Sequence, residues 1–301
     1  MAVYAEGRIH IMELEANKRV AAIHDLSGAG KSSLTVVLPV LSALGCEVSV
    51  LPTAVLSTHT GGFKSPVYID LTDDMLPIAQ HWKREGACFG ALYSGFLGSA
   101  AQIGIVRDIF EMFREGNPQA KILVDPVMGD NGRLYSTYTR EMADGMARLC
   151  EKADIIVPNM TEAYHLLGET YREGPYDEAE IRRMLRGLSA LGAETVVMTG
   201  VYFDGKQVGA ACWDHAADTV RFCLEDRVPG LFHGTGDVFA SAMLGAYLCG
   251  LPIADACGCA VRYTAKCIEE TVLAGRTDTR WGVKFEKCLP FLMKDVFSLA
   301  K

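Results

Sequence analysis

Short apolar runs alternate along the chain with longer stretches in which apolar residues recur every three or four positions. The short runs are RVAAIHD, CEVSVLP, CFGALYSG, KILVDP, ADIIVPN and ETVVMTG, and their length and composition are typical of buried strands. The longer stretches between most of them have the spacing of amphipathic helices. This alternation predicts an α/β fold with a mostly parallel central sheet and helices on both faces.

The pattern changes after Gly200. The run VYFDGKQVGAACW places a turn at Asp204 and Gly205 between two strand-like segments, and TVRFCLEDRV follows it, so we expect an antiparallel hairpin and a further antiparallel strand toward the C-terminal half. The next segment, FHGTGDVFASAMLGAYLCGLP, has a glycine-rich turn and then a helix that is apolar on every side. Such a helix is expected to be buried.

Composition narrows the class of protein. The chain has 301 residues, 50% of them hydrophobic, and no Pro/Ser-rich linker, so we expect residues 1–301 to form a single domain. No apolar run reaches the roughly 18 residues that cross a bilayer, and charges are scattered through the N-terminus, which predicts a soluble, cytoplasmic protein. A net charge of −8 without a basic cluster argues against nucleic acid as a ligand.

The ten cysteines lie mostly inside apolar segments, so we interpret them as reduced core thiols rather than as a disulfide framework. The CGC sequence at Cys257 and Cys259 lacks the C-x-x-C spacing of zinc sites.

The stretch HDLSGAGKSSL, residues 24–34, ends like a nucleotide-binding P-loop. That motif needs a glycine five positions before Gly30, and Asp25 stands there instead, where its carboxylate would repel phosphates. We therefore interpret SGAG as a turn between a strand and a helix, and we expect Lys31 to be solvated. Because the turn follows a strand of an open α/β sheet, it is still expected to contact a ligand.

The sequence GTGD, residues 234–237, is the strongest chemical signal. Its glycines leave backbone N–H groups open at a helix N-terminus, where partial positive charge gathers, so Gly234, Thr235 and Gly236 predict an anion hole. The same field is expected to keep Asp237 ionised and able to accept a proton. From these four residues alone, a simple helix cap is an equal alternative for Asp237.

Polar residues also follow three of the predicted strands. VDPVMGDNG supplies Asp125 and Asp130, VPNMTEA supplies Asn159 and Glu162, and VVMTG supplies Thr199. Carboxylate, amide and hydroxyl oxygens are the ligands that Mg²⁺ and its waters prefer. Taken singly, Asp125 could end a strand and Glu162 could open a helix, but all five are expected on one rim of the sheet.

The motifs GTGD, PNMTEA and DPVMGD together resemble the ribokinase-type small-molecule kinases. LPTAVLSTHTGG and YSGFLGS are similar to segments of the pyridoxal and pyridoxamine kinases within that group. The resemblance spans about residues 18–275 and leaves residues 1–17 as an N-terminal extension. It implies a ribokinase-like fold, commonly a homodimer, and ATP-dependent phosphorylation of the 5′-hydroxymethyl group of a vitamin B6 vitamer.

The resemblance also implies a role for each matching position. Asp237 would be the base and the GTG turn the anion hole, residues 129–135 would form a flap, and Mg²⁺ with a monovalent cation such as K⁺ would lie near the phosphates. The substrate-binding positions would be Asp25, Thr53, His59, Phe96 and His233, the ATP-binding positions Asp130, Asn159 and Thr199, and the metal-binding positions Asp125 and Glu162.

Two positions depart from the family pattern, since many relatives have serine at Asp25 and an apolar residue at His233. If Asp25 faces the substrate, its carboxylate can pair with the amino group of pyridoxamine, which predicts a preference for that vitamer.

Two alternatives stay open. A hydroxymethylpyrimidine kinase shares the Asp-x-Ser-Gly turn and an aromatic substrate with a hydroxymethyl group, although its usual turn has one more glycine than DLSGAG. A vitamer-binding protein that has lost turnover is the other, and the intact Asp237 and Glu162 argue against it.

Overall fold

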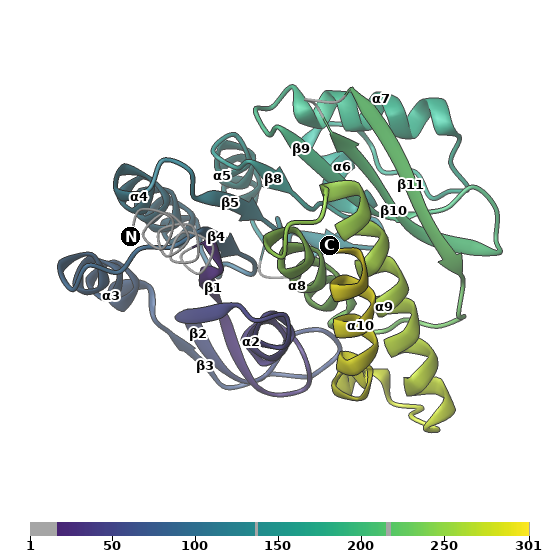
Figure 1. Ribbon diagram of the computed structural model, residues 1–301, viewed down its shortest axis with the longest axis horizontal. Coiled ribbons are helices and arrows are strands. Elements are labelled where there is room, and N and C mark those ends of the chain that lie inside the picture. The colour runs from purple at the N-terminus through teal and green to yellow at the C-terminus, as the bar shows by residue number, and fades with distance from the viewer. Residues whose placement is uncertain (1–16, 136–137, 215–217, 301) are drawn as a thin grey trace, which may run out of the picture.

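The structure is a computed structural model that describes residues 17–135, 138–214 and 218–300. Apart from Asn17, the proposed N-terminal extension lies outside the described residues. Within them, nine strands form one sheet in the order β11-β10-β9-β8-β5-β4-β1-β2-β3 (Figure 1). These strands are β1 Arg19–Ala29, β2 Glu47–Thr58, β3 Tyr68–Asp70, β4 Ala91–Ser94, β5 Lys121–Val124, β8 Ile155–Ile156, β9 Thr195–Val201, β10 Gln207–Asp214 and β11 Thr219–Asp226.

The centre of the sheet is parallel and its two edges are antiparallel. Strands β2, β1, β4, β5, β8 and β9 pair in parallel, whereas β3 runs against β2, and β10 runs against both β9 and β11. The predicted mostly parallel sheet and the predicted hairpin at Asp204 and Gly205 are therefore confirmed. A separate two-stranded hairpin, β6 Gly129–Asp130 with β7 Arg133–Leu134, stands at the expected flap.

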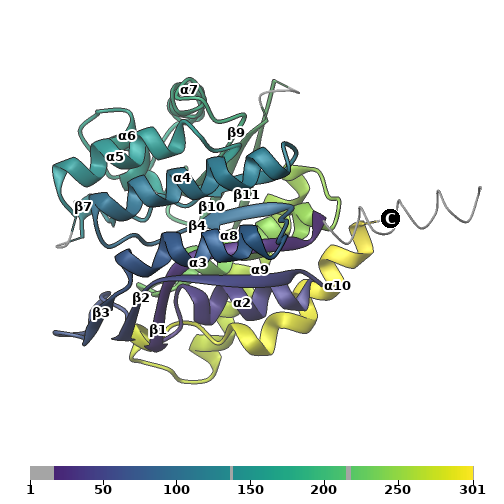
Figure 2. The same cartoon turned by 90° about the vertical axis from the view of Figure 1, so that its left-hand side faces the viewer.

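Helices cover both faces of the sheet. One core joins the sheet to α3, α4, α5, α6 and α7, and the other joins it to α2, α8, α9 and α10. Figures 1 and 2 show these two layers from perpendicular directions. The helices are α2 Leu34–Ala43, α3 Thr72–Arg84, α4 Ala100–Gly116, α5 Arg140–Cys150, α6 Met160–Leu166, α7 Glu178–Ser189, α8 Thr235–Leu248, α9 Ile253–Leu273 and α10 Leu289–Leu299.

The two cores explain why the strands are continuous apolar runs. In β1, Val20 and Ala22 belong to the core under α8, whereas Ala21 and Ile23 belong to the opposite core. Because side chains alternate between faces and both faces are covered, neither set of positions is polar. Helix α8 is buried continuously from Val238 to Ala246, as its apolar sequence predicts.

The opening segment differs from its prediction. SGAG is not a turn, because β1 continues to Ala29 and pairs with β2 as far as Thr58. Lys31 is not simply solvated either, because its ammonium pairs with the carboxylate of Glu286.

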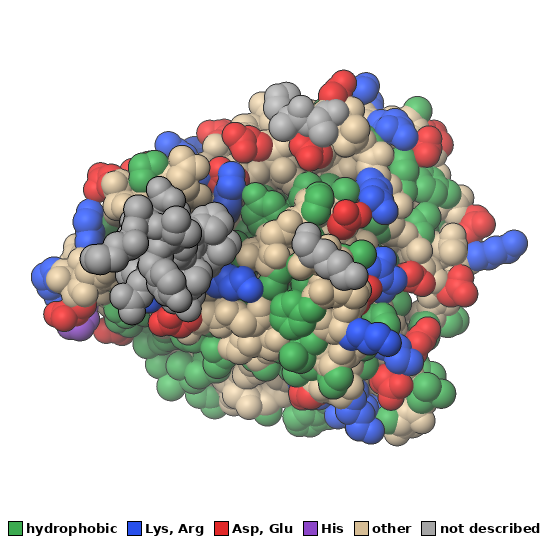
Figure 3. Space-filling model, viewed as in Figure 1, with side chains coloured by type: hydrophobic (Ala, Val, Ile, Leu, Met, Phe, Trp, Pro, Cys, Tyr) green, Lys and Arg blue, Asp and Glu red, His purple; other side chains and the backbone are tan. Residues whose placement is uncertain are grey.

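The surface and the cysteines add two observations. The face in Figure 3 carries acidic and basic side chains interspersed, without a continuous basic patch. All ten cysteines are free thiols, and seven are buried.

Across the described ranges, no helix has the length and apolar character needed to span a membrane.

Candidate active site

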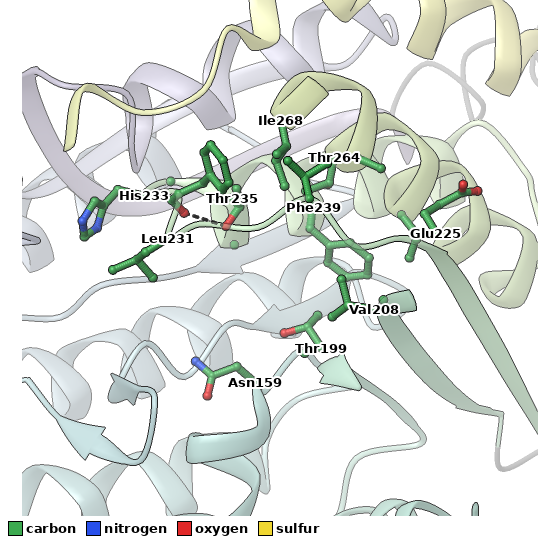
Figure 4. A pocket seen from close by; sticks show the side chains of 18 of the residues that line it. Asn159, Thr199, Val208, Glu225, Leu231, His233, Thr235, Phe239, Thr264 and Ile268 are labelled. Atoms are coloured by element: carbon green, nitrogen blue, oxygen red, sulfur yellow. Dashed lines mark hydrogen bonds between the residues drawn. The ribbon is translucent and has the colours of Figure 1, made fainter. Parts of the chain in front are cut away.

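Two cavities meet at the N-terminus of α8. The first, of about 360 Å³, extends between α9 and the β9–β11 edge and is lined by Thr199, Val208, Phe239 and Ile268, among others (Figure 4). The second, of about 370 Å³, lies at the ends of β1 and β2. Five residues line both cavities: Asp130, Tyr135, Leu231, His233 and Gly234.

Gly234 makes the start of α8 possible. Its φ of 75° is left-handed, and a Cβ at this position would lie 2.0 Å from the carbonyl oxygen of Lys31, so only glycine fits. Among the described residues no side chain caps the helix, and the Thr235 hydroxyl donates backward to the Phe232 carbonyl at 3.0 Å. The first N–H groups of α8 therefore stay available at the junction of the cavities, as the anion-hole prediction requires.

Asp237 does not cap its own helix. Its Oδ2 accepts a hydrogen bond of 2.8 Å from the backbone N–H of Ser33, and the residue lines the second cavity. Burial raises the pKa of Asp237 to about 7, and the nearby Asp25 adds to the rise, while the Ser33 N–H opposes it. Desolvation thus opposes the ionisation that the helix field was expected to favour. A pKa near 7 suits a general base.

Asn159 and Glu162 form a capping box at the start of α6. The Asn159 side chain accepts from the Glu162 N–H at 3.1 Å, and Glu162 Oε2 accepts from the Asn159 N–H at 2.9 Å. Glu162 Oε1 accepts from the Met128 N–H at 2.8 Å, and Asn159 donates to the Gly129 carbonyl at 2.8 Å. Both side chains therefore hold the loops of the site, which is the helix-start alternative that the sequence left open.

Asp125 lies close to two other carboxyl groups. It is 8% exposed, and burial together with Glu162 and Asp237 raises its pKa well above the ordinary value. Burial also raises the pKa of Glu162 to about 7, which the backbone N–H donors partly offset. The structure thus brings three acidic residues together on the predicted rim.

Asp130 and Thr199 lie where the sequence predicts. Asp130 is exposed on the flap hairpin and contributes to both cavities. The flap is attached to α6, because the Gly132 N–H donates to the Thr161 hydroxyl at 2.8 Å. Thr199 lies in β9 and faces α8 across the first cavity (Figure 4).

Four of the five predicted substrate residues line the second cavity: Asp25, His59, Phe96 and His233. Thr53 is not among these lining residues. It is fully buried in β2, and its hydroxyl donates to the Phe96 carbonyl at 3.3 Å, which places it behind the cavity wall.

Two of these residues already have partners. His59 Nδ1 accepts from the Gly61 N–H at 3.1 Å, and Nε2 donates to the Arg280 carbonyl at 2.6 Å, so both ring nitrogens have partners, as in a satisfied turn histidine. Asp25 is 3% exposed and accepts from the hydroxyls of Ser33 at 2.5 Å and Ser27 at 2.7 Å. Burial raises the pKa of Asp25, and these two hydroxyls counteract the rise.

Sequence reasoning missed a polar layer beneath Asp237. His24, Tyr93 and Ser241 are fully buried, and their side-chain polar atoms have no hydrogen-bond partner among the described residues. Tyr93 faces Ser241 and lies near Asp125 and Asp237. Burial is the main cause that raises the pKa of Tyr93, and the negative charges of these two residues raise it further. Ser241 could have been found, since it follows Asp237 by one helical turn in an otherwise apolar helix. Tyr93 gave no signal inside its apolar run.

Comparison of the sequence with known proteins identifies the family to which this chain is similar. The sequence profile described as phosphomethylpyrimidine kinase matches residues 40–280. A pyridoxine/pyridoxal/pyridoxamine kinase from Bordetella avium is 28% identical over 250 residues, which cover 79% of this chain and 80% of that protein.

Solved structures agree in fold over nearly the whole chain. A Bacteroides thetaiotaomicron protein assigned as a phosphomethylpyrimidine kinase and crystallised with pyridoxal is 37% identical, with a TM-score of 0.85, and the match covers 91% of this chain and 95% of that one. Pyridoxal kinase from Lactobacillus plantarum is 33% identical, with a TM-score of 0.82 and coverage of 92% and 96%.

Proposed function

The chain belongs to the phosphomethylpyrimidine kinase family, and from this membership we propose that it transfers the γ-phosphate of ATP to the 5′-hydroxymethyl group of a vitamin B6 vitamer. The observation that carries the proposal is the meeting of two cavities at the uncapped start of α8, with Asp237 in the second. Relatives that are pyridoxal kinases, including one structure with ADP and pyridoxamine, support this choice of substrates.

The first cavity suits the nucleotide. Val208, Phe239, Val261 and Ile268 give it an apolar end for a flat base, and its other end reaches Gly234. The second cavity suits a substituted pyridine, because Phe96 offers an aromatic face while Asp25 and His233 offer polar contacts. The phosphoryl group would then cross between the cavities at the N-terminus of α8.

In this arrangement Asp237 accepts the proton of the hydroxymethyl group as its oxygen attacks the γ-phosphorus. The bond between that phosphorus and the bridging oxygen breaks, so ADP leaves and the vitamer 5′-phosphate forms. The N–H groups in the first turn of α8 donate to the phosphoryl oxygens on which negative charge is concentrated. Positioning both partners supplies most of the remaining rate.

Asp125 and Glu162 are the two carboxyl groups that would hold a divalent cation. Burial, Glu162 and Asp237 raise the pKa of Asp125, so a cation bound beside it would favour the ionised carboxylate. Asp125 would hold magnesium directly, and Glu162 through water, since both Glu162 oxygens already accept backbone hydrogen bonds. Magnesium, when bound, neutralises charge on the transferred phosphate. The K⁺ expected from the resemblance would belong to the same acidic rim.

Asp25 supports a preference for pyridoxamine. Its carboxylate lines the second cavity and can form a charge-assisted hydrogen bond with the amino group of that vitamer, which the aldehyde of pyridoxal cannot supply. Such a bond is worth about 1.5–3 kcal/mol. We expect Asp25→Asn to lower the ratio of kcat/KM for pyridoxamine to that for pyridoxal by about tenfold or more, and an unchanged ratio would contradict the assignment.

The second candidate is a hydroxymethylpyrimidine kinase, which the description of the matching family favours. A panel of pyridoxal, pyridoxamine, pyridoxine and hydroxymethylpyrimidine with ATP and magnesium separates the two. A higher kcat/KM for a vitamer supports our proposal, and a higher value for the pyrimidine replaces it with the second candidate. If none of the four compounds stimulates ATP consumption, the chain would instead be a binding protein without turnover.

A further inference from the structure

Cys223 of β11 and Cys257 of α9 face each other where these two elements pack together. The Cys223 sulfur lies 3.8 Å from the carbonyl oxygen of Ala254, and a Cβ at Gly258 would lie 3.8 Å from the same sulfur. Residues 254, 257 and 258 share one helix face by their spacing. The Cys257 thiol therefore lies beside the Cys223 thiol, and the two side chains interact.

The two thiols differ in accessibility and in acidity. Cys223 is half-buried, whereas Cys257 is fully buried. Interaction with Cys257 lowers the pKa of Cys223 to about 7, and Arg221 and Arg262 help, against the effect of burial. The pKa of Cys257 is raised well above its ordinary value by the same interaction and by burial. At neutral pH the thiol of the less buried Cys223 is thus the better nucleophile, and that of Cys257 stays protonated.

We propose that Cys223 and Cys257 are a dithiol modification site that a hydroperoxide converts into a disulfide. The Cys223 thiolate attacks one oxygen of hydrogen peroxide, the O–O bond breaks, and the released hydroxide takes up the proton that Cys223 lost on ionising, so a sulfenic acid and one water result. The Cys257 sulfur then attacks the sulfenic sulfur, the S–S bond forms and a second water leaves. Two thiols lose two hydrogens and two electrons, and hydrogen peroxide takes them up as two waters.

The disulfide would join two elements that border the first cavity. Glu225 follows Cys223 by two residues on the same side of β11, and Val261 follows Cys257 by about one turn of α9, and both line that cavity. Closing the bond would fix the position of β11 against α9. We therefore expect oxidation to change nucleotide affinity, a consequence that rests on the proposed function of this cavity.

Other arrangements of cysteine are less suited to this reaction. Cys267 and Cys288 also interact, but both are buried, so an oxidant reaches neither easily. Cys88 is half-buried like Cys223, but it belongs to a short segment between α3 and β4. Within the described ranges no three His, Cys, Asp or Glu side chains are placed to hold a metal ion, so the pair is a dithiol and not half of a metal site.

The chemical test uses the reduced full-length chain, freed of reductant and titrated with hydrogen peroxide near one equivalent. After alkylation, the intact mass should show the loss of two hydrogens, and a peptide map should join the segments that carry Cys223 and Cys257. Cys223→Ser and Cys257→Ser should each abolish the cross-link, while the matched control Cys88→Ser should retain it. Unchanged mass, a cross-link between Cys267 and Cys288 instead, or an undiminished cross-link in Cys257→Ser would overturn the proposal.

A binding measurement tests the consequence separately. Calorimetry with ADP should show a change in Kd of about fivefold or more on oxidation, in the range typical of coupled sites. Dithiothreitol should reverse it, and Cys257→Ser should not show it. An unchanged Kd in the cross-linked protein would overturn the link to the cavity. ADP binding in neither redox state would instead count against the proposed nucleotide site, without affecting the cross-link result.

Discussion

Helices α6 and α8 begin at the same edge of the sheet and carry a carboxyl group at the same helical position. Glu162 stands three residues after Asn159, the N-cap residue of α6, and Asp237 stands three residues after Gly234, the N-cap residue of α8. In α6 the two side chains close the helix start by a reciprocal capping box. In α8 no side chain caps the helix, and the carboxylate reaches the Ser33 N–H of another loop.

The difference shows that the residue before the helix decides what the acidic residue does. Asn159 occupies the space in front of α6 with its own amide group, so Glu162 completes a structural unit. Gly234 has no side chain, and its left-handed backbone leaves the N–H groups of α8 facing the junction of the two cavities. We infer that α8 performs the chemistry and that α6 holds the loops around it.

The strongest test of this contrast is Asp237→Asn. The amide keeps an acceptor for the Ser33 N–H but cannot take a proton from the substrate hydroxyl. We expect kcat to fall by about 10² to 10⁴, as for a positioned base, with little change in KM. Steady-state kinetics with each vitamer measure the loss, and Asp204→Asn in an exposed turn serves as the control. Wild-type turnover in the Asp237 variant would remove the basis of the mechanism.

Substituting each glycine of the GTGD turn by alanine distinguishes the contribution of this turn to stability from its contribution to catalysis. Gly234→Ala should lower the free energy of unfolding by about 1–3 kcal/mol through its left-handed φ alone, and the contact with the Lys31 carbonyl adds to this. Gly236→Ala meets open space and should fold normally, yet its methyl group would stand near the expected phosphate path. Denaturant unfolding and ATP kinetics together test this. Equal stability of the two variants would contradict the close approach.

Glu162→Gln tests the opposite property at α6. One of the two carboxylate oxygens becomes an NH₂ group that faces a backbone N–H, from either Met128 or Asn159. Leaving one buried donor unsatisfied costs about 1–3 kcal/mol, so the free energy of unfolding should fall by that amount, unlike in Asp237→Asn. Urea titration of both variants at the same pH checks the contrast. A fully stable Glu162 variant would show that the capping box is not what fixes these loops.

Local patterns in the sequence predicted most of the fold. Apolar runs such as KILVDP and ETVVMTG identified the buried strands because both faces of the sheet are covered, and the turn at Asp204 and Gly205 marked the hairpin. The extension of β1 to Ala29 was not predictable from composition. Whether SGAG turns or continues depends on its pairing with β2, which is a contact between segments far apart in the sequence.

The site was predicted in its location but not in its bonding. Residues at the carboxyl ends of strands do converge, since a parallel sheet brings those ends to one edge. Partners from other segments could not be foreseen, such as Ser33 for Asp25 and Asp237 or Arg280 for His59. The face of β2 on which Thr53 lies could not be foreseen either, since alternate strand residues point to opposite faces and only the register decides which of them faces the cavity.

The pH dependence of catalysis gives the finest test of the contrast between α6 and α8. Burial raises the pKa of both Asp237 and Glu162 to about 7, but only Asp237 is proposed to take a proton in the reaction. A base is inactive when protonated, so kcat/KM should rise about tenfold per pH unit below about 7 and level off above it. Any residual activity of Asp237→Asn should lack this dependence.

The carboxyl group of Asp237 should lower the stability of the folded chain over the same pH range in which it raises kcat/KM. Its pKa in the folded chain lies above the ordinary value of 3.8, so the folded state binds more protons between these values, and stability falls as the pH rises from about 4 through about 7. Asp237→Asn removes that contribution, so the variant should gain stability relative to wild type as the pH is raised from 5 to 8. Denaturant unfolding at several pH values measures the difference. A constant difference across this range would show that burial does not set the protonation of Asp237, and the contrast with α6 would then rest on the N–H groups of α8 alone.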